Sequence, residues 1–306
     1  MPKTIYPGVE IPDVVDRAHP IDAIETGIPV FVGLGRSDEG GGLAAPVTSF
    51  AEFEKRFGMP RYRLSEGVRL FFDNGGSRCY VSPVPGDKPT HEGLRAGLAA
   101  ATDLADVDLV VVPDAALVRA DDYGALMRDV LKDCARTRRF ALLEAREGAD
   151  FGAAWRSWGA AYAIPGGKVA GLIAAEDAIH GPWKAPAELP NATLQRDGEW
   201  KYVTVRRLSI LIERSIERGL DWVAHEPRNA DLFSLVRGVV KHFLLDLWRK
   251  GALVGPEPES AFFLRCDGTT MGIEDLDDGD FIIEVSFAPI KPKELVVLRI
   301  VQKLTA

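Results

Sequence analysis

The chain has 306 residues, of which 46% are hydrophobic, and a formal net charge of −8. A chain of this length buries roughly three quarters of its unfolded surface, so it can fold without disulfides or structural metals, in about two domains. The negative charge, without a dominant cluster of Lys and Arg, argues against a surface that binds nucleic acid.

Targeting and redox signals are also missing from the sequence. No apolar run approaches the ~20 residues that a membrane span requires, and residues 1–10 lack the apolar core of a secretory signal. Cys79, Cys134 and Cys266 are widely separated and odd in number. This spacing predicts neither a disulfide framework nor a zinc site.

Residues 1–20 predict an extended N-terminal arm. Prolines recur at positions 2, 7, 12 and 20, and such spacing prevents a helix and favours extended backbone. Apolar side chains lie between the prolines, chief among them Ile5, Tyr6, Val9, Ile11 and Val14. Because an extended arm cannot bury these side chains by itself, it needs a partner, either its own chain or another copy.

Residues 21–188 predict an α/β domain with a mostly parallel sheet. Strands are expected at 28–34, 78–84, 109–112, 140–144 and 169–174, and helices at 49–58, 65–73, 92–102, 121–136 and 149–160. Apolar strands that alternate with helices are typical of a parallel sheet covered on both faces. Ser49 is the expected N-cap of the first helix, and Gly58 ends it.

The remaining residues predict a smaller α+β domain after a polar, proline-containing connection at 185–199. Helices are expected at 205–220 and 230–250, and strands at 261–266, 280–287 and 294–302. The helix at 230–250 carries a wide apolar stripe, with Asn229 or Asp231 as its cap. The last strand alternates apolar and polar residues and ends the chain without a partner strand after it.

Motifs in the C-terminal half resemble the C-terminal domain of contractile phage-tail sheath proteins. They are Trp200-Lys-Tyr-Val-Thr-Val-Arg-Arg-Leu208, Gly219-Leu-Asp-Trp222, Phe243-Leu-Leu-Asp-Leu-Trp248, Gly251-Ala-Leu253 and Phe287-Ala-Pro-Ile-Lys-Pro-Lys-Glu294. The N-terminal half resembles the same family in the same order, through Tyr6-Pro-Gly8, Phe31-Val-Gly33, Pro46-Val-Thr-Ser49, Phe71-Phe-Asp-Asn-Gly-Gly76 and Val169-Ala-Gly171. After Ala187 the family usually continues through a further stretch that is missing here. The resemblance therefore implies a compact main sheath subunit, with a minor ring near the baseplate or a cap-like protein of the same fold as the alternative.

The resemblance implies a structural subunit rather than an enzyme. Many copies would form hexameric layers around an inner tube, and the sheath would contract to drive the tube through a target envelope. The expected partners are other copies, the tube protein, and baseplate and terminator or cap proteins, with no cofactor, metal, nucleic acid or membrane. Assembly is expected in the bacterial cytoplasm, before incorporation in a virion tail or an extracellular particle.

The resemblance also divides the chain and implies contact residues. An inner sheath domain would span 191–293, joined by the N-terminal arm, and 294–306 would form a C-terminal arm. Both arms would add strands to neighbouring copies. The expected arm contacts are Ile5, Tyr6, Val9, Ile11, Val14, Leu295, Val297, Leu298 and Ile300. The alternative is that both arms pair within their own domain.

Arg237 and Lys241 lie four residues apart and share one face of the helix at 230–250. In the sheath family that this chain resembles, a helix of the inner domain contacts the tube. The resemblance therefore implies Arg237, Lys241 and Trp248 as the tube contacts. The alternative is an ordinary solvated face.

An enzyme is the competing interpretation. The glycine-rich loop at 33–42 follows a strand, as a dinucleotide-binding turn would, but its spacing fits neither common phosphate-binding pattern. Asp114 follows the strand at 109–112, where α/β enzymes place catalytic groups; a turn or helix cap is the alternative.

Overall fold

The computed structural model describes residues 19–36, 44–58, 62–144, 155–189, 202–272, 275, 278–290 and 295–304. These residues fold into two compact units. One unit is Ile24–Leu211; the other takes the described residues up to Ala23 together with those from Ile212 onward. The division falls inside helix α7 (Val203–Gly219), so it does not coincide with the expected boundary at 188–191.

The first unit is a three-layer α/β structure around a six-stranded sheet in the order β2-β3-β1-β4-β5-β6. The strands β1 (Pro29–Leu34), β3 (Cys79–Val84), β4 (Leu109–Val111), β5 (Phe140–Glu144) and β6 (Gly159–Tyr162) are parallel to their neighbours. Only β2 (Ala45–Val47) pairs antiparallel, with β3. The expected mostly parallel sheet is confirmed.

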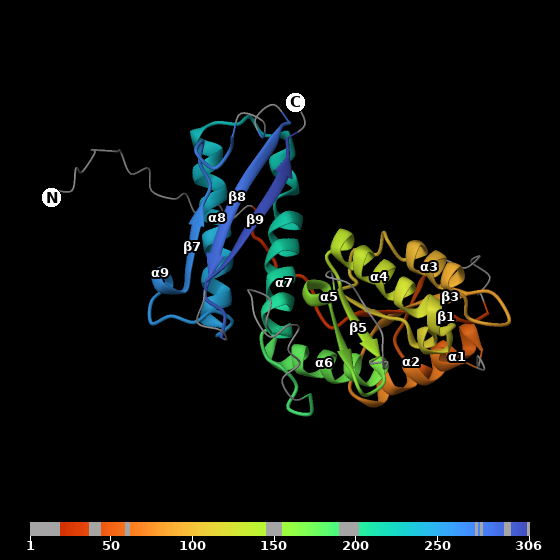
Figure 1. The fold of residues 1–306 in the computed structure, drawn as a ribbon. Helices are drawn as coiled ribbons and strands as arrows, with labels where there is room; N and C mark the ends of the chain where they lie inside the picture. Colours follow the sequence, from red (N-terminus) through yellow and green to blue (C-terminus); the bar gives the residue numbers. More distant parts are fainter. Residues whose placement is uncertain are drawn as a thin grey trace. The chain divides into compact units, whose positions relative to one another are not determined.

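Helices cover both faces of this sheet (Figure 1). Residues of α1 (Phe50–Phe57), α2 (Arg63–Asp73), α6 (Gly166–His180) and the start of α7 pack on one face. Residues of α3 (His91–Ala100) and α4 (Ala120–Thr137) pack on the other. The expected cap is present, because the Ser49 hydroxyl accepts a hydrogen bond from the Glu52 N–H at the start of α1.

One sequence-based assignment in this unit is wrong, and another is correct only in part. Val169–Ala174, expected to be a strand, lies inside helix α6. Of the helix expected at 149–160, the described part is only the single turn α5 (Trp155–Trp158), which leads directly into β6. For the first, Gly167 and Gly171 of α6 lie against the backbone of α2, where an added Cβ would meet Gly67 and Phe71. Glycine is unfavourable inside a helix, so an apolar run that contains it does not indicate one.

The second unit contains helices α8 (Ala230–Arg249) and α9 (Pro258–Ala261) and a three-stranded antiparallel sheet in the order β7-β8-β9. The strands are β7 (Phe262–Arg265), β8 (Asp280–Phe287) and β9 (Val296–Lys303). The sheet packs on α8, where the rings of Phe233 and Phe281 stack 5.3 Å apart. The Asn229 side chain accepts from the Leu232 N–H at 2.9 Å, as expected for the cap of α8.

The expectation that the C-terminal strand lacks a local partner is wrong. All eight residues of β9 are in register with β8, from Asp280 opposite Lys303 to Phe287 opposite Val296. The β8 strand has a buried face and follows α8 in the same unit, so β9 completes that core.

The end of the N-terminal arm packs on the second unit. The ring of His19 stacks on Trp222 with centroids 4.5 Å apart, and Ile21 is buried. An added Cβ at Gly219 would lie 2.7 Å from Ile21, so the helix needs glycine there. The five arm residues from Ile5 to Val14 lie outside the described residues.

Candidate functional site

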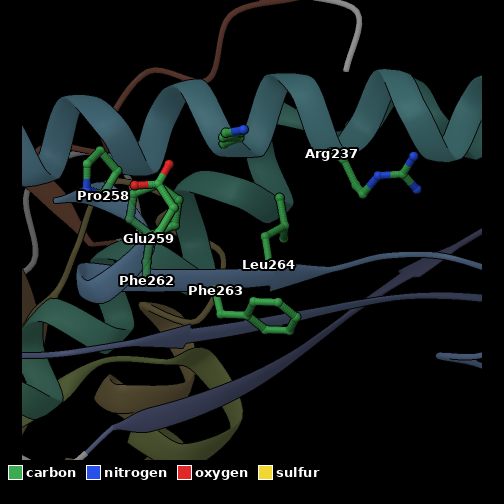
Figure 2. Close-up of a pocket in the computed structure, with 7 residues that line it drawn as sticks. Arg237, Pro258, Glu259, Phe262, Phe263 and Leu264 are labelled. Atoms are coloured by element: carbon green, nitrogen blue, oxygen red, sulfur yellow. The ribbon is translucent and has the colours of Figure 1, made fainter. Parts of the chain in front are cut away.

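A groove of about 200 Å³ runs between α8 and β7 in the second unit. Arg237 and Lys241 of α8 line one side, and residues of α9 and β7 line the other: Pro258, Glu259, Phe262, Phe263 and Leu264. Figure 2 shows Phe263 on the side of β7 away from the helix. The structure thus brings Arg237 and Lys241 to one surface, as the sequence predicts, and adds an apolar wall that the sequence did not predict.

The two cations differ in their surroundings. The Nη1 atom of Arg237 donates to the carbonyl oxygen of Cys266 at 2.7 Å, which ties α8 to the end of β7. Burial raises the pKa of the Cys266 thiol to about 12, although the nearby Arg237 opposes this shift. Lys241 lies one turn further along and is exposed. Arg237 therefore stabilises the unit itself, and Lys241 is the better placed for an external contact.

Trp248 does not belong to this groove. Its indole Nε1 donates to the carbonyl oxygen of Gly255 at 3.0 Å, and the ring is half-buried. The side chain therefore holds the connection between α8 and α9. Nothing in this geometry assigns it an external contact.

The outer face of the three-stranded sheet exposes apolar side chains. Phe263 of β7, Ser286 of β8 and Val297 of β9 are cross-strand neighbours in one row. Phe263 is 64% exposed and Val297 56%, and Leu295, just before β9, is 59% exposed. By contrast, Leu298 and Ile300 are buried in the core of their own unit. Of the expected C-terminal contact residues, only Leu295 and Val297 present their side chains to solvent.

The enzyme interpretation depends on polar side chains at the carboxyl ends of the parallel strands. Asp114 lies there but serves as a backbone acceptor: its Oδ2 accepts from the Leu34 N–H at 2.6 Å and its Oδ1 from the Arg63 N–H at 2.7 Å. Burial raises the pKa of Asp114, and these hydrogen bonds oppose the shift. Asp114 thus joins the end of β1 to the start of α2, which fits the capping alternative.

A polar pocket lies nearby, lined in part by Arg63, Tyr123, Glu144 and Tyr162. Arg63 and Glu144 pair with each other at 2.5 Å, and the Tyr123 hydroxyl donates to the Glu144 carbonyl oxygen. Most of the loop at 33–42 lies outside the described residues. Across the described ranges, no group of three or more His, Cys, Asp and Glu is arranged to hold a metal, and no helix is long and apolar enough to cross a membrane.

One buried ionic cluster is not predicted from the sequence. Arg207, near the start of α7, is buried and pairs with Asp177 of α6 and Asp108 before β4. Burial lowers the pKa of Arg207, but the two carboxylates raise it more, so the guanidinium stays charged. The only sequence signal is the pair Arg206-Arg207 in an otherwise apolar helical turn.

Comparison with known proteins gives a consistent result. Residues 195–303 match the family profile of the phage tail sheath C-terminal domain. No curated protein sequence matches the chain.

Two similar solved structures are sheaths in the contracted state. The helical sheath of the anti-feeding prophage is 25% identical with a TM-score of 0.75, over 96% of this chain and 98% of that chain. The sheath complex of the extracellular contractile injection system PVC is 25% identical with a TM-score of 0.69, over 97% and 98%. A chain of the anti-feeding prophage baseplate shares the fold at 24% identity and a TM-score of 0.72, over 98% and 100%.

Proposed function

We propose that the whole chain is a sheath subunit of a contractile injection system, on the premise that residues 195–303 match the phage tail sheath C-terminal domain family. The observation that carries this proposal is the extent of the similarity: it runs through both units and nearly the full length of two contractile sheath chains. The similarity covers 98% of each of those two sheath chains. The short connection after Ala187 is therefore compatible with a main sheath subunit.

In this function many copies assemble in hexameric layers around an inner tube, and contraction drives the tube forward. Energy stored in the extended lattice does this work, and a bistable interface between copies propagates the change. The proposal gives no residue a catalytic role and requires no cofactor. Assembly takes place in the cytoplasm, and the partners are other copies, the tube, the baseplate and a cap.

The arms connect neighbouring copies by adding strands to exposed sheet edges. Among the described strands, β7 and β9 are the two edges of the sheet in the second unit. Backbone N–H and C=O groups on such edges pair readily with another chain. Ile5, Tyr6, Val9, Ile11 and Val14 supply the apolar side chains of the N-terminal arm. Since Leu298 and Ile300 are buried, the C-terminal contact uses Leu295, Val297 and the backbone of β9.

Deletion of residues 1–15 tests the role of the N-terminal arm. The shortened chain should fold, because both cores lie within the described residues, but it should sediment as a monomer. The full chain under the same conditions should form large polymers. Polymers of normal size from the shortened chain would contradict the arm proposal.

The groove between α8 and β7 faces acidic groups of the tube through Lys241. The variant Lys241→Glu should abolish co-sedimentation with the cognate tube protein, since it replaces attraction by repulsion. The matched control is Lys250→Glu, which makes the same change of charge at an exposed position outside the groove. Arg237→Glu is a poorer test, because it also removes the hydrogen bond to Cys266. Equal tube binding by the two Lys variants would contradict this contact.

A second candidate is a ring at the baseplate end of the sheath, favoured by the likeness to a baseplate chain over 98% of this protein. The two candidates differ in copy number. A main sheath subunit forms long tubes, whereas a baseplate ring stops at one or a few layers. Counting layers in electron micrographs of purified particles separates them.

A further inference from the structure

The buried cluster around Arg207 joins segments that are far apart in the sequence. The guanidinium donates to both carboxylate oxygens of Asp177, at 2.8 and 2.5 Å, and to Oδ2 of Asp108 at 3.1 Å. The Arg207 side chain is 4% exposed, and those of Asp108 and Asp177 are 5% and 1% exposed. The cluster lies within the α/β unit, at the amino ends of the parallel strands β1 and β4.

The cluster also holds the segment that enters the α/β unit. Asp108 accepts from the Gly27 N–H at 3.0 Å and the Ile28 N–H at 2.7 Å. Two carboxylates facing one guanidinium leave an excess negative charge in a buried site. The two N–H donors offset that excess, so Arg207 and the segment at 24–28 are bound to the same carboxylate.

Further contacts fix the incoming segment in the same place. Arg78 pairs with Glu25 in that segment and with Asp106 next to the cluster. Gly27 has φ of +77°, and a Cβ there would lie 2.8 Å from the Cα of Ala174 in α6. The incoming segment is therefore held both by charge and by close packing.

The outgoing segment is the first half of α7. The side chains of Val203, Val205, Leu208 and Ile210 are buried, and the guanidinium of Arg206 lies 3.7 Å from the ring centroid of Trp158. The chain passes between the two units twice, after Ala23 and after Leu211. Both passages thus lead to segments that the Arg207 cluster holds.

We infer that the Arg207–Asp108–Asp177 cluster is a junction lock, which fixes the incoming segment at 24–28 and the outgoing segment at 203–211 as one rigid part of the α/β unit. Replacing a buried ion pair by well-packed apolar residues is often neutral for stability, so we assign this cluster a role in joining the two segments rather than in net stability. The Nε–H of Arg207, which is buried and has no hydrogen-bond partner in the described structure, is consistent with that role.

Hydrogen–deuterium exchange on the full-length chain tests the lock. Arg207→Met removes the guanidinium while keeping much of the apolar side chain. The inference expects amide exchange to increase at least tenfold in both 24–28 and 203–211, although the substitution lies in only one of them. Strands β5 and β8 should exchange as in the parent chain. The control Arg249→Met breaks an exposed ion pair with Asp246 and should change neither segment.

Arg207→Lys provides the second variant if Arg207→Met does not fold. It keeps a buried cation but loses the fork that reaches both carboxylates, and it should loosen the same two segments to a smaller degree. Increased exchange in 203–211 alone would overturn the inference, because the cluster would then anchor α7 without holding the incoming segment. Unchanged exchange in both segments would overturn it as well.

Discussion

The crossing of α2 and α6 offers a sharp test of the fold, because two glycine backbones meet there. A Cβ added at Gly167 would lie 2.1 Å from the carbonyl oxygen and 2.7 Å from the carbonyl carbon of Gly67. Carbon atoms in contact prefer a separation of about 3.5–4.0 Å. Since the obstacle is backbone, one helix must shift by roughly 1 Å to admit a single methyl group.

The cost of Gly167→Ala follows from this geometry. Overpacking a well-filled core costs about 1–3 kcal/mol, and a clash with backbone belongs at the upper end. Alanine regains at most about 1 kcal/mol of helix propensity, and less so close to the N-terminus of α6. We expect a net loss of about 2 kcal/mol, or about 4–8 °C in the melting temperature of a unit of this size.

Thermal and urea unfolding of Gly167→Ala and of a matched control measure this loss. The control is Gly35→Ala in the same unit, where an added Cβ would meet its nearest neighbours at an ordinary 3.4 Å. The control should stay within about 0.5 kcal/mol of the parent chain. If the two variants were equally stable, the close crossing of α2 and α6 would be refuted.

Three further outcomes are expected from single sites. Asp114→Ala leaves the backbone N–H groups of Leu34 and Arg63 without their acceptor and should cost about 3 kcal/mol in urea unfolding. Asp121→Ala on the surface should cost almost nothing, and equal effects would contradict the capping role. Asn229→Ala should cost about 1 kcal/mol through loss of the α8 cap, and Asn229→Ser should restore most of it. The three cysteines are fully buried, so a thiol reagent should label none in the native protein and all three in denaturant; rapid native labelling would contradict their burial.

Local signals in the sequence predicted much of the fold correctly. Ser49 and Asn229 precede apolar helical patterns, and both side chains cap the helices that follow. The apolar runs at β1, β4 and β5 fit a parallel sheet with two covered faces, where no alternation of polar and apolar residues is needed. These features depend on residues that are close together in the sequence, so one amino-acid sequence is enough to predict them.

The missed features depend on partners distant in sequence. Val169–Ala174 has the apolar pattern of a strand but lies in α6, whose glycines contact Gly67 and Phe71 of α2. The pairing of β9 with β8 depends on how the chain folds back, which an alternating pattern does not specify. The ion pair between Arg207 and Asp108 spans 99 positions, and only the fold brings the two charges together.

Some of the expected contact residues in the second unit have exposed side chains, and others are buried in its core. Lys241, Leu295 and Val297 are exposed, and they remain predicted contacts with the tube and with neighbouring copies. Leu298 and Ile300 are buried because alternation along β9 directs them toward the core of the same unit. An alternating pattern cannot indicate which of its two faces meets the domain core.

Electron microscopy of the full-length chain, produced together with its cognate tube protein, tests the sheath proposal most directly. The proposal expects tubes with stacked hexameric layers of this chain surrounding the inner tube, and a shorter, wider form after contraction is triggered. Bare tubes beside dispersed monomers of this chain would contradict it.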